Sequence, residues 1–518
     1  MSSSVISQVK SSIIITEMKR KISATMATQH PDHAQIPYWH TEAFISTQFE
    51  AQEALSAYSE LGIGEYKWDW EGKLVDESIL ERLFSSNFEF FKNHPLGVDT
   101  FLTFRLPNPK VETEFRIGRA FMNLASGASI ARHFDLPSPP IFEVILPMTQ
   151  TAQEMLSIQL AYQQMHKLKH PLYRLENILT NLRIIPLFED VNTIINSDRI
   201  LEEYLKLYKL KFKKTPPYMR PYVARSDPAL NSGIVPTVLA IKIALSRYRK
   251  LEKKLGIPLY PIIGAAVFPF RGGISPLRIE EFADEYKGIR TTTIQSAFRY
   301  DFNKKDVVKA ILKLEELLPS QKAVEISLKE EAQIIELIPY FEAYYKEVIE
   351  EIAPIINNVS KLLPKRRERV QHIGLFGYSR GVGKVKLPRA IGFTGALYCL
   401  GIPPELIGTG RGLKKAKQFL GLEIVEKYYK YIKTDLIQAG KYLNRDNLER
   451  LNRKSKIWSK IKEDIKAIED IFHITLGPIT KEDKEHKLLT DKIYQNLENP
   501  KVISELILDA AIIRKSLG

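Results

Sequence analysis

The sequence predicts an α/β fold, namely a (β/α)8 barrel of the TIM type with additional helices and a C-terminal helical region. Three observations predict it. Short apolar runs recur along the first part of the chain, most of them lack strict alternation, and stretches with helical periodicity separate them. Strands without alternation are typical of a parallel sheet that is buried on both faces. Most steps between runs are about 30–40 residues, the length of one strand–helix unit.

Eight such units favour a closed barrel over an open sheet. The expected strands are GEYKWDW (64–70), DTFLTFR (99–105), IFEVILP (141–147), RIIPLFE (183–189), RPYVARS (220–226), YPIIGAAVF (260–268), RTTTIQSAF (290–298) and QHIGLFGYS (371–379). We expect a disordered leader over 1–17 and a catalytic barrel over 18–382 with a helical excursion at about 304–363. Helical patterns after Arg380 predict a C-terminal helical region over 383–518, packed on the barrel.

The composition indicates a large globular protein with a basic surface. The chain has 518 residues, 44% of them hydrophobic, and 75 Lys and Arg against 61 Asp and Glu give a formal net charge of +14. The basic residues are scattered among acidic ones, and no nucleic-acid motif occurs, so we expect an anion-attracting site rather than nucleic-acid binding. A basic scaffold or nucleic-acid-binding protein is the alternative that binding at high salt would favour.

Cysteine usage and hydropathy restrict the location of the protein. Cys399 is the only cysteine, which excludes an internal disulfide and a cysteine-based metal cluster. The N-terminal stretch lacks the apolar core of a signal peptide, and no apolar run reaches the roughly 18–20 residues that span a membrane. We therefore expect a cytoplasmic protein without membrane contact.

The ends of the predicted strands carry ionisable groups, and in a barrel of this type the chemistry lies at the carboxyl ends of the strands. Acidic and basic side chains alternate around this rim, which favours a functional site over an unspecific polar edge. The residues concerned are Asp69, Glu71, Arg105, Glu143, Glu189, Asp190, Arg225, Asp227, Arg271, Gln295, Arg299 and Arg380.

Glu189 and Asp227 follow adjacent predicted strands, so their carboxylates are expected to converge on one hard divalent cation. Oxygen ligands favour Mg²⁺ or Mn²⁺, with water and substrate completing the octahedron. The alternative for Asp227 is a helix N-cap, because SDPA is a good helix start with proline in the first turn. A cap would not explain Glu189.

Three arginines supply planar, permanently charged groups suited to phosphate or carboxylate: Arg105, Arg271 and Arg299. Each alone is more often part of a surface ion pair, but together with a metal they describe a site for a phosphorylated carboxylic acid. In PFRGGISP (269–276), Gly272 and Gly273 predict a flap whose backbone approaches and folds over the anion.

The stretch MATQHPDH (26–33) precedes the first predicted strand. Pro31 makes the backbone of His30 extended and stiff. A lone histidine is usually structural, and its spacing from Asp32 and His33 matches no zinc signature. From these residues alone, a structural role for His30 is favoured.

The motifs MATQHPDH, WDWEGKLVD, LTFRLPNP, FEVILPMT, IPLFED, ARSDPALNSG, PFRGGISP, TIQSAFRYD and GLFGYSR occur in this order. From about Met18 onwards the chain resembles archaeal-type phosphoenolpyruvate carboxylase. The resemblance implies a Mg²⁺-dependent, anaplerotic conversion of phosphoenolpyruvate and bicarbonate to oxaloacetate and phosphate, through carboxyphosphate and the enolate of pyruvate. It also implies a homotetramer and inhibition by aspartate or malate. The alternative is another enolpyruvate-handling barrel enzyme, either a C–C lyase or a phosphotransferase.

The resemblance also implies roles for individual residues. PLFE and SDPA match the metal-ligand segments and place Glu189 and Asp227 on the metal. The resemblance also implies that His30 acts in the carboxylation half-reaction, which reverses the structural interpretation given above. The complete expected set is His30, Arg271 and Arg225 as catalytic residues, and Arg105, Arg271, Arg299, Gly272, Gly273, Gln295 and Arg380 as substrate-binding residues.

The chain departs from the pattern of the bacterial and plant relatives in three places. Pro269 and Phe270 stand where those relatives have His-Gly, and a second Arg-Gly-Gly is missing, so that only Arg278 follows. The lysine expected three residues after the ligand aspartate is Leu230. We expect Arg225 to replace its charge from the same strand end.

Overall fold

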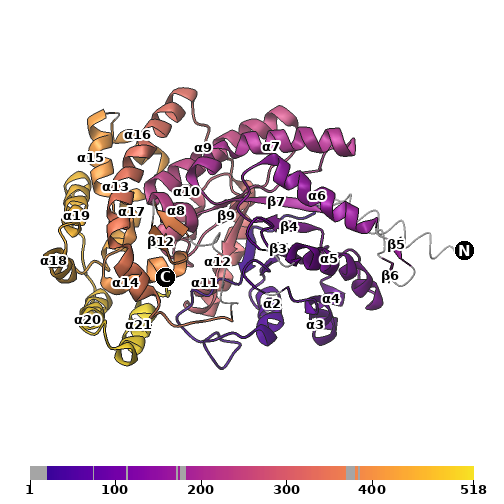
Figure 1. Ribbon diagram of the computed structural model, residues 1–518, viewed down its shortest axis with the longest axis horizontal. Helices are drawn as coiled ribbons and strands as arrows, with labels where there is room; N and C mark the ends of the chain where they lie inside the picture. The colour runs from indigo at the N-terminus through magenta and orange to yellow at the C-terminus, as the bar shows by residue number, and fades with distance from the viewer. Residues whose placement is uncertain are drawn as a thin grey trace, which may run out of the picture.

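The computed structural model describes residues 20–73, 75–112, 115–167, 169–170, 173–174, 182–368, 380–382, 385–419 and 421–518. Eight parallel strands form a closed barrel, which confirms the predicted fold class (Figure 1). In order around the barrel these are β1 (Thr25–Thr28), β2 (Glu65–Asp69), β3 (Phe101–Arg105), β4 (Glu143–Leu146), β7 (Arg183–Phe188), β8 (Tyr222–Ala224), β9 (Ile262–Gly264) and β10 (Thr291–Ile294).

The strand that closes the barrel is β1, and it corrects the predicted set of strands, although their number, eight, is as predicted. Its residue Thr25 pairs with Thr292 of β10, and Met26 pairs with Glu65 of β2. The prediction began the barrel at 64–70 and took 371–379 as the eighth strand; the barrel closes without that segment, which lies outside the described residues. β1 was overlooked because TMAT is only four residues long and half threonine, although every residue in it is buried.

Each barrel strand is followed by at least one helix. These are α2 (Glu50–Ser59), α3 (Ile79–Ser86), α4 (Phe88–Asn93), α5 (Arg116–His133), α6 (Ala152–His166), α7 (Val191–Phe212), α8 (Ser226–Ser232), α9 (Ile234–Leu255), α10 (Ile279–Glu285), α11 (Ser296–Tyr300) and α12 (Lys304–Ser320). The long helices α7 and α9 pack against each other on one side of the barrel. Asp190 caps α7, because its carboxylate accepts the Thr193 N–H at 2.8 Å.

The side chains of β2 alternate between the two faces of the barrel wall. Tyr66 and Trp68 belong to the apolar core shared with the surrounding helices. Glu65, Lys67 and Asp69 are in the opposite phase and therefore face the barrel interior, where a separate apolar cluster lies. That cluster consists of Met26, Ile145, Ile185, Leu187, Tyr222, Ala224 and Ile262.

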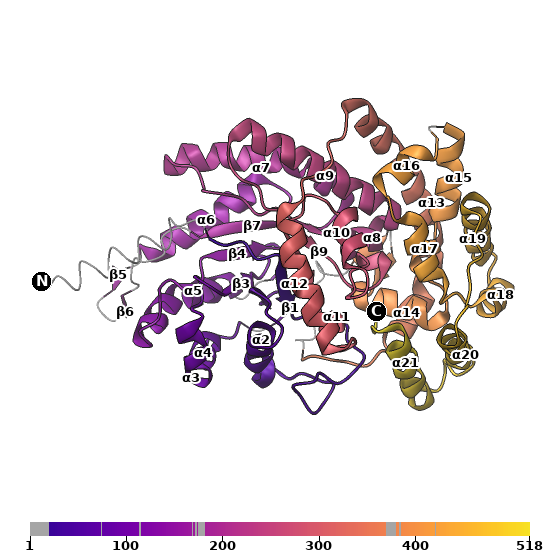
Figure 2. The same ribbon diagram turned by 180° about the vertical axis from the view of Figure 1, so that it is seen from behind.

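The remaining helices form a second layer beside the barrel (Figure 2). They are α13 (Leu328–Ser360), α14 (Ala390–Leu400), α15 (Thr409–Phe419), α16 (Glu423–Tyr428), α17 (Ile432–Gly440), α18 (Arg445–Lys454), α19 (Trp458–Phe472), α20 (Lys481–Gln495) and α21 (Pro500–Arg514). Two-stranded sheets are made by β5 (Lys169–His170) with β6 (Tyr173–Arg174), and by β11 (Arg380–Val382) with β12 (Val385–Leu387).

The segment predicted as an excursion, 304–363, contains α12 and α13. Helix α12 follows β10 and contacts β1 and α10, whereas α13 packs on α9, α14 and α15. After α21 the chain returns to the barrel, since the Leu517 N–H donates to the Asp32 carbonyl at 2.8 Å. The C-terminal helices therefore pack beside the end of the barrel at which Asp32 lies.

Candidate active site

The loops that follow the strands meet at the carboxyl ends, and Arg271 contacts several of them at once. Its Nη1 atom lies 3.2 Å from the Asp32 carboxylate after β1, and Nη2 donates to the Gln295 Oε1 atom after β10 at 2.6 Å. Its Nε atom donates to the Ser226 hydroxyl after β8 at 3.2 Å, and Nη1 also donates to the Gly518 carbonyl. With 1% exposure, Arg271 is fixed at the centre of these loops.

Arg105 is held by two carboxylates at the ends of β2 and β3. Its Nε atom donates to Asp69 Oδ1 at 2.8 Å, and Nη1 forms an ion pair with Glu71. Burial would lower the pKa of Arg105, but the charges of Asp69, Glu71 and Glu189 outweigh it and raise that pKa well above its usual value. The guanidinium therefore keeps its charge in a buried position.

Glu189 and Asp227 are brought to the same end of the barrel. Glu189 directly follows β7, is 6% exposed, and accepts the Met148 N–H at 2.7 Å. Asp227 lies in the first turn of α8, just after β8. Burial raises the pKa of the Tyr222 phenol inside the barrel, and the charges of both carboxylates add to this shift. The two carboxylates thus follow adjacent strands at the same end of the barrel.

His30 lies in the loop after β1, partly exposed. Its Nδ1 atom is 2.8 Å from the Thr28 hydroxyl oxygen. Burial lowers the pKa of the imidazole well below its usual value, and the nearby Lys67 ammonium lowers it further. His30 is therefore a neutral imidazole at neutral pH, which is the form that can accept a proton.

The loop at 269–276, predicted to be a flap, forms a tight turn with hydrogen bonds on both sides. Arg225 lies behind it, and its Nη1 and Nη2 atoms donate to the carbonyls of Phe270 and Pro269, both at 3.1 Å. From the C-terminal region, the buried Glu405 accepts the Phe270 N–H at 2.9 Å. Burial raises the pKa of Glu405 to about 7. These contacts hold the loop from both sides in a conformation that presents Arg271.

The two glycines of the loop serve this tight turn. Gly272 and Gly273 have φ angles of +122° and +72°. A Cβ atom on Gly272 would lie 2.6 Å from the Ala265 Cβ atom, which is closer than packed side chains approach. The glycines therefore allow the chain to fold back against its own strand.

Replacing Gly272 with alanine is expected to destabilise the protein by about 2 kcal/mol and to lower turnover, because both the backbone angle and the space oppose a Cβ. The matched control is Gly62→Ala, at a φ of +73° with no atom within 4 Å of the added Cβ. It should cost only about 1 kcal/mol of backbone strain and leave turnover unchanged. Urea unfolding measures the stability of each variant, and steady-state rates measure its turnover. Equal effects of the two substitutions would contradict the proposed role of Gly272 in the turn.

The structure places the other predicted residues as follows. Arg299 is buried behind β1, where its Nη2 atom donates to the Thr28 carbonyl and to Glu53, both at 2.8 Å. Gln295 accepts from Arg271. Arg380 begins β11, which packs against α8, and nothing further of its side chain is described.

Two residues at this end were not in the predicted set. Asp32 bonds Arg271 and caps α11, accepting the Ala297 N–H at 2.8 Å. Lys67 is buried inside the barrel, with its Nζ atom 3.3 Å from Asp69. The signal for Lys67 was in the sequence, since the charged residues of EYKWD alternate with aromatic ones and so share a face.

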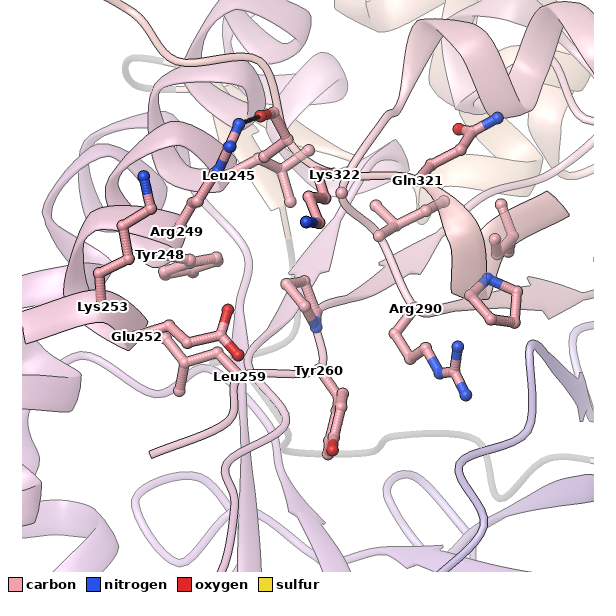
Figure 3. Close-up of a pocket in the computed structure, with 16 residues that line it drawn as sticks. Leu245, Tyr248, Arg249, Glu252, Lys253, Leu259, Tyr260, Arg290, Gln321 and Lys322 are labelled. Atoms are coloured by element: carbon pink, nitrogen blue, oxygen red, sulfur yellow. Dashed lines mark hydrogen bonds between the residues drawn. The ribbon is translucent and has the colours of Figure 1, made fainter. Parts of the chain in front are cut away.

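A pocket of about 390 Å³ lies at the end of the barrel opposite to the candidate active site. Figure 3 shows Arg249, Glu252 and Lys253 of α9 on one side of it, facing Arg290 and Gln321 on the other. Arg290 immediately precedes β10, so this pocket adjoins the amino ends of the strands. It is separate from the residues described above.

Within the described part of the chain, no single helix has the length and apolar character needed to cross a membrane. One sharply bent pair of segments, Ala390–Leu400 with Pro404–Phe419 at 93°, meets the criteria of length and composition together.

Comparisons with known proteins agree over nearly the whole chain. The family model described as phosphoenolpyruvate carboxylase matches residues 22–518. A protein of that name from Leuconostoc mesenteroides is 37% identical over 503 residues, which cover 96% of this chain and 99% of its own. Its namesake from Metallosphaera sedula is 39% identical over 523 residues, covering 96% of this chain and all of its own. The namesake from Methanospirillum hungatei is 38% identical over 524 residues, with the same coverage.

Proposed function

The chain belongs to the phosphoenolpyruvate carboxylase family, and we propose that it converts phosphoenolpyruvate and bicarbonate to oxaloacetate and inorganic phosphate. The observation that carries the proposal is the convergence of Arg105, Arg271, Glu189 and Asp227 at the carboxyl ends of one barrel, in a chain that matches the family along its length. Such a rim provides cations for two anionic substrates and carboxylates for a divalent ion.

The reaction requires two anions to be held while charge moves between them. An oxygen of bicarbonate attacks phosphorus, and the bond between phosphorus and the enol oxygen breaks. The products of this step are carboxyphosphate and the enolate of pyruvate. His30 takes the carboxyl proton of carboxyphosphate as the bond between the carboxyl carbon and the phosphate oxygen breaks; CO₂ is released, and the proton passes to the departing phosphate. The enolate carbon then attacks CO₂ and forms the new C–C bond.

The arginines position the substrates in this scheme. Arg105, fixed by Asp69 and Glu71, binds the phosphate, and Arg271 holds the anion that forms beside it. Both guanidiniums are almost completely buried, Arg105 at 5% and Arg271 at 1% exposure. Burial keeps water from the enolate, which would otherwise be protonated to pyruvate.

Glu189 and Asp227 would hold the divalent cation, Mg²⁺ or Mn²⁺. The donor set fits, because two hard carboxylates from adjacent strands leave positions for water and substrate oxygens. Among the described residues, no group of three or more His, Cys, Asp or Glu is placed to hold a metal by itself. When bound, the ion would neutralise negative charge that develops on phosphate and enolate oxygens.

We assign structural positioning roles to two arginines that the sequence had placed at the substrates. Arg225 donates to two carbonyls of the 269–276 loop and to the Tyr286 hydroxyl at 3.0 Å. Arg299 joins β1 to α2 through the Thr28 carbonyl and Glu53. Their charges are directed into these contacts, so they support Arg271 and His30 from behind.

The decisive experiment couples the reaction to malate dehydrogenase, with Mg²⁺ and bicarbonate supplied or withheld. We expect oxaloacetate formation that requires both, with one phosphate released per oxaloacetate. A C–C lyase or phosphotransferase would release no phosphate in a bicarbonate-dependent manner. Absence of bicarbonate-dependent oxaloacetate at several temperatures would exclude the proposed function.

On the family likeness alone, we also propose a cytoplasmic homotetramer that aspartate or malate inhibits. Analytical ultracentrifugation of the purified chain tests the oligomeric state, and rates measured with either dicarboxylate added test the inhibition.

A further inference from the structure

Lys67 is a buried lysine in the interior of the barrel that the proposed reaction does not yet use. It is 1% exposed, and its Nζ atom lies 3.3 Å from the Asp69 Oδ1 atom. The same oxygen accepts the Arg105 Nε–H at 2.8 Å, so one carboxylate serves two cations. An ammonium carries three donors, and a desolvated one is retained only where its charge is compensated.

The neighbouring strand places His30 close to this ammonium. In the β1–β2 pair, Thr28 is the register partner of Lys67, so both side chains project from the same level into the barrel interior. The Thr28 hydroxyl oxygen lies 2.8 Å from His30 Nδ1, so the imidazole is bonded to the residue that is paired with Lys67.

The charges that face His30 come from three elements besides its own. They are Lys67 and Asp69 on β2, Arg105 on β3, and Arg271 after β9. Burial lowers the pKa of His30 most, Lys67 lowers it next, and Asp69 opposes them. Burial and Arg105 lower the pKa of Lys67 itself to about 8, against the charges of Asp69 and Glu71.

We propose that Lys67 is a positioning residue for His30: its ammonium, fixed beside Asp69, keeps the neighbouring imidazole neutral and able to take up a proton. The proposal rests on the proposed function, in which His30 receives the carboxyl proton of carboxyphosphate. A protonated imidazole at this place would have no capacity for that proton.

The first test is the pH dependence of kcat/KM in Lys67→Gln and Lys67→Arg. Glutamine keeps a donor for Asp69 but no charge, so the acid limb of the profile should move to higher pH. Arginine keeps the charge and should leave the limb in place. A purely structural lysine would lower rates or stability in both variants without moving the limb, and that result would overturn the proposal.

The second test reads the imidazole directly in the free protein, without substrate or metal. NMR of histidine-labelled protein, with His30→Gln to assign the signal, should show that His30 in the wild type titrates well below the usual histidine range. In Lys67→Gln its titration should move upward, and in Lys67→Arg it should not. A wild-type His30 that titrates near 6.5 would overturn the proposal without any Lys67 variant.

Lys73→Gln is the matched control, because Lys73 is also buried but its Nζ atom bonds Gln29 at 3.0 Å and pairs with Glu50. It should leave the His30 titration unchanged. An equal shift in this variant would indicate general loosening and contradict a specific role of Lys67. The NMR experiment needs no turnover, so it tests the role of Lys67 even if carboxylation is not observed. Absence of carboxylation would refute the proposed function instead.

Discussion

Replacing Glu189 with glutamine is expected to lower kcat on the order of 10³-fold while the barrel stays folded. Glutamine retains an oxygen that can accept the Met148 N–H, now bonded at 2.7 Å, but it removes one negative charge. A divalent cation held by two carboxylates would lose one of its two charged protein ligands. The measurements are steady-state rates at saturating bicarbonate and calorimetric titration of Mg²⁺ or Mn²⁺ into the free protein, where affinity should fall as well.

The adjacent Asp190 provides a matched control. Its carboxylate caps α7 through the Thr193 N–H at 2.8 Å, and asparagine is an equally good cap. Asp190→Asn therefore removes a charge one residue away and should change turnover only a few-fold, whereas Asp227→Asn should behave like Glu189→Gln. Wild-type turnover or metal affinity in Glu189→Gln would remove this residue from the proposed metal site.

The barrel was predictable from the sequence to the extent that its strands are apolar runs. Seven predicted runs contain the strands β2, β3, β4, β7, β8, β9 and β10. The closing strand β1, with the sequence TMAT, is not an apolar run. Its four residues form a strand because they pair with β2 on one side and β10 on the other. Its position inside the His30 motif also explains why that motif lies at the candidate site.

The rim of the site was predictable because parallel strands bring their carboxyl ends to one edge, but the direction of each side chain was not. Arg225 ends β8 as expected, yet the Tyr286 hydroxyl and two loop carbonyls bind its guanidinium. Those partners lie 44 to 61 residues away in sequence and become neighbours only after folding. Spacing alone therefore predicts which residues lie at the strand ends, but it does not predict the direction of a side chain such as that of Arg225.

Replacing Arg220 with methionine is expected to destabilise the barrel by about 3–5 kcal/mol. Arg220 lies at the amino end of the interior, where Nη1 and Nη2 bond Glu65 at 2.9 and 2.7 Å and Nη1 also bonds Glu143 at 2.8 Å. All three side chains are at most 2% exposed, and Arg20 is the second cation on the two carboxylates. Methionine fills similar space but leaves two buried carboxylates with one guanidinium, and the thermal midpoint should fall by roughly 5 °C.

The pH dependence separates this effect from a loss of packing. Burial raises the pKa of Glu65, but Arg20 and Arg220 outweigh it and lower that pKa to about 2. A carboxyl group with a lowered folded pKa stabilises the protein above its unfolded pKa of about 4.3, and this contribution is lost as pH falls towards 2. The difference between wild type and Arg220→Met should therefore be largest at neutral pH and shrink below about pH 4.

Arg290→Met is the control for Arg220→Met, because Arg290 is a partly exposed arginine near the same end whose Nη2 atom donates to the Ile22 carbonyl at 3.4 Å. Its replacement should change stability by about 1 kcal/mol or less, with no dependence on pH between 7 and 3. If Arg220→Met were equally mild, or if its cost stayed constant as Glu65 became protonated, the ion-pair network would not be what stabilises this end of the barrel. The cost would then come from the volume and hydrogen bonds of the side chain, which protonation of Glu65 does not alter.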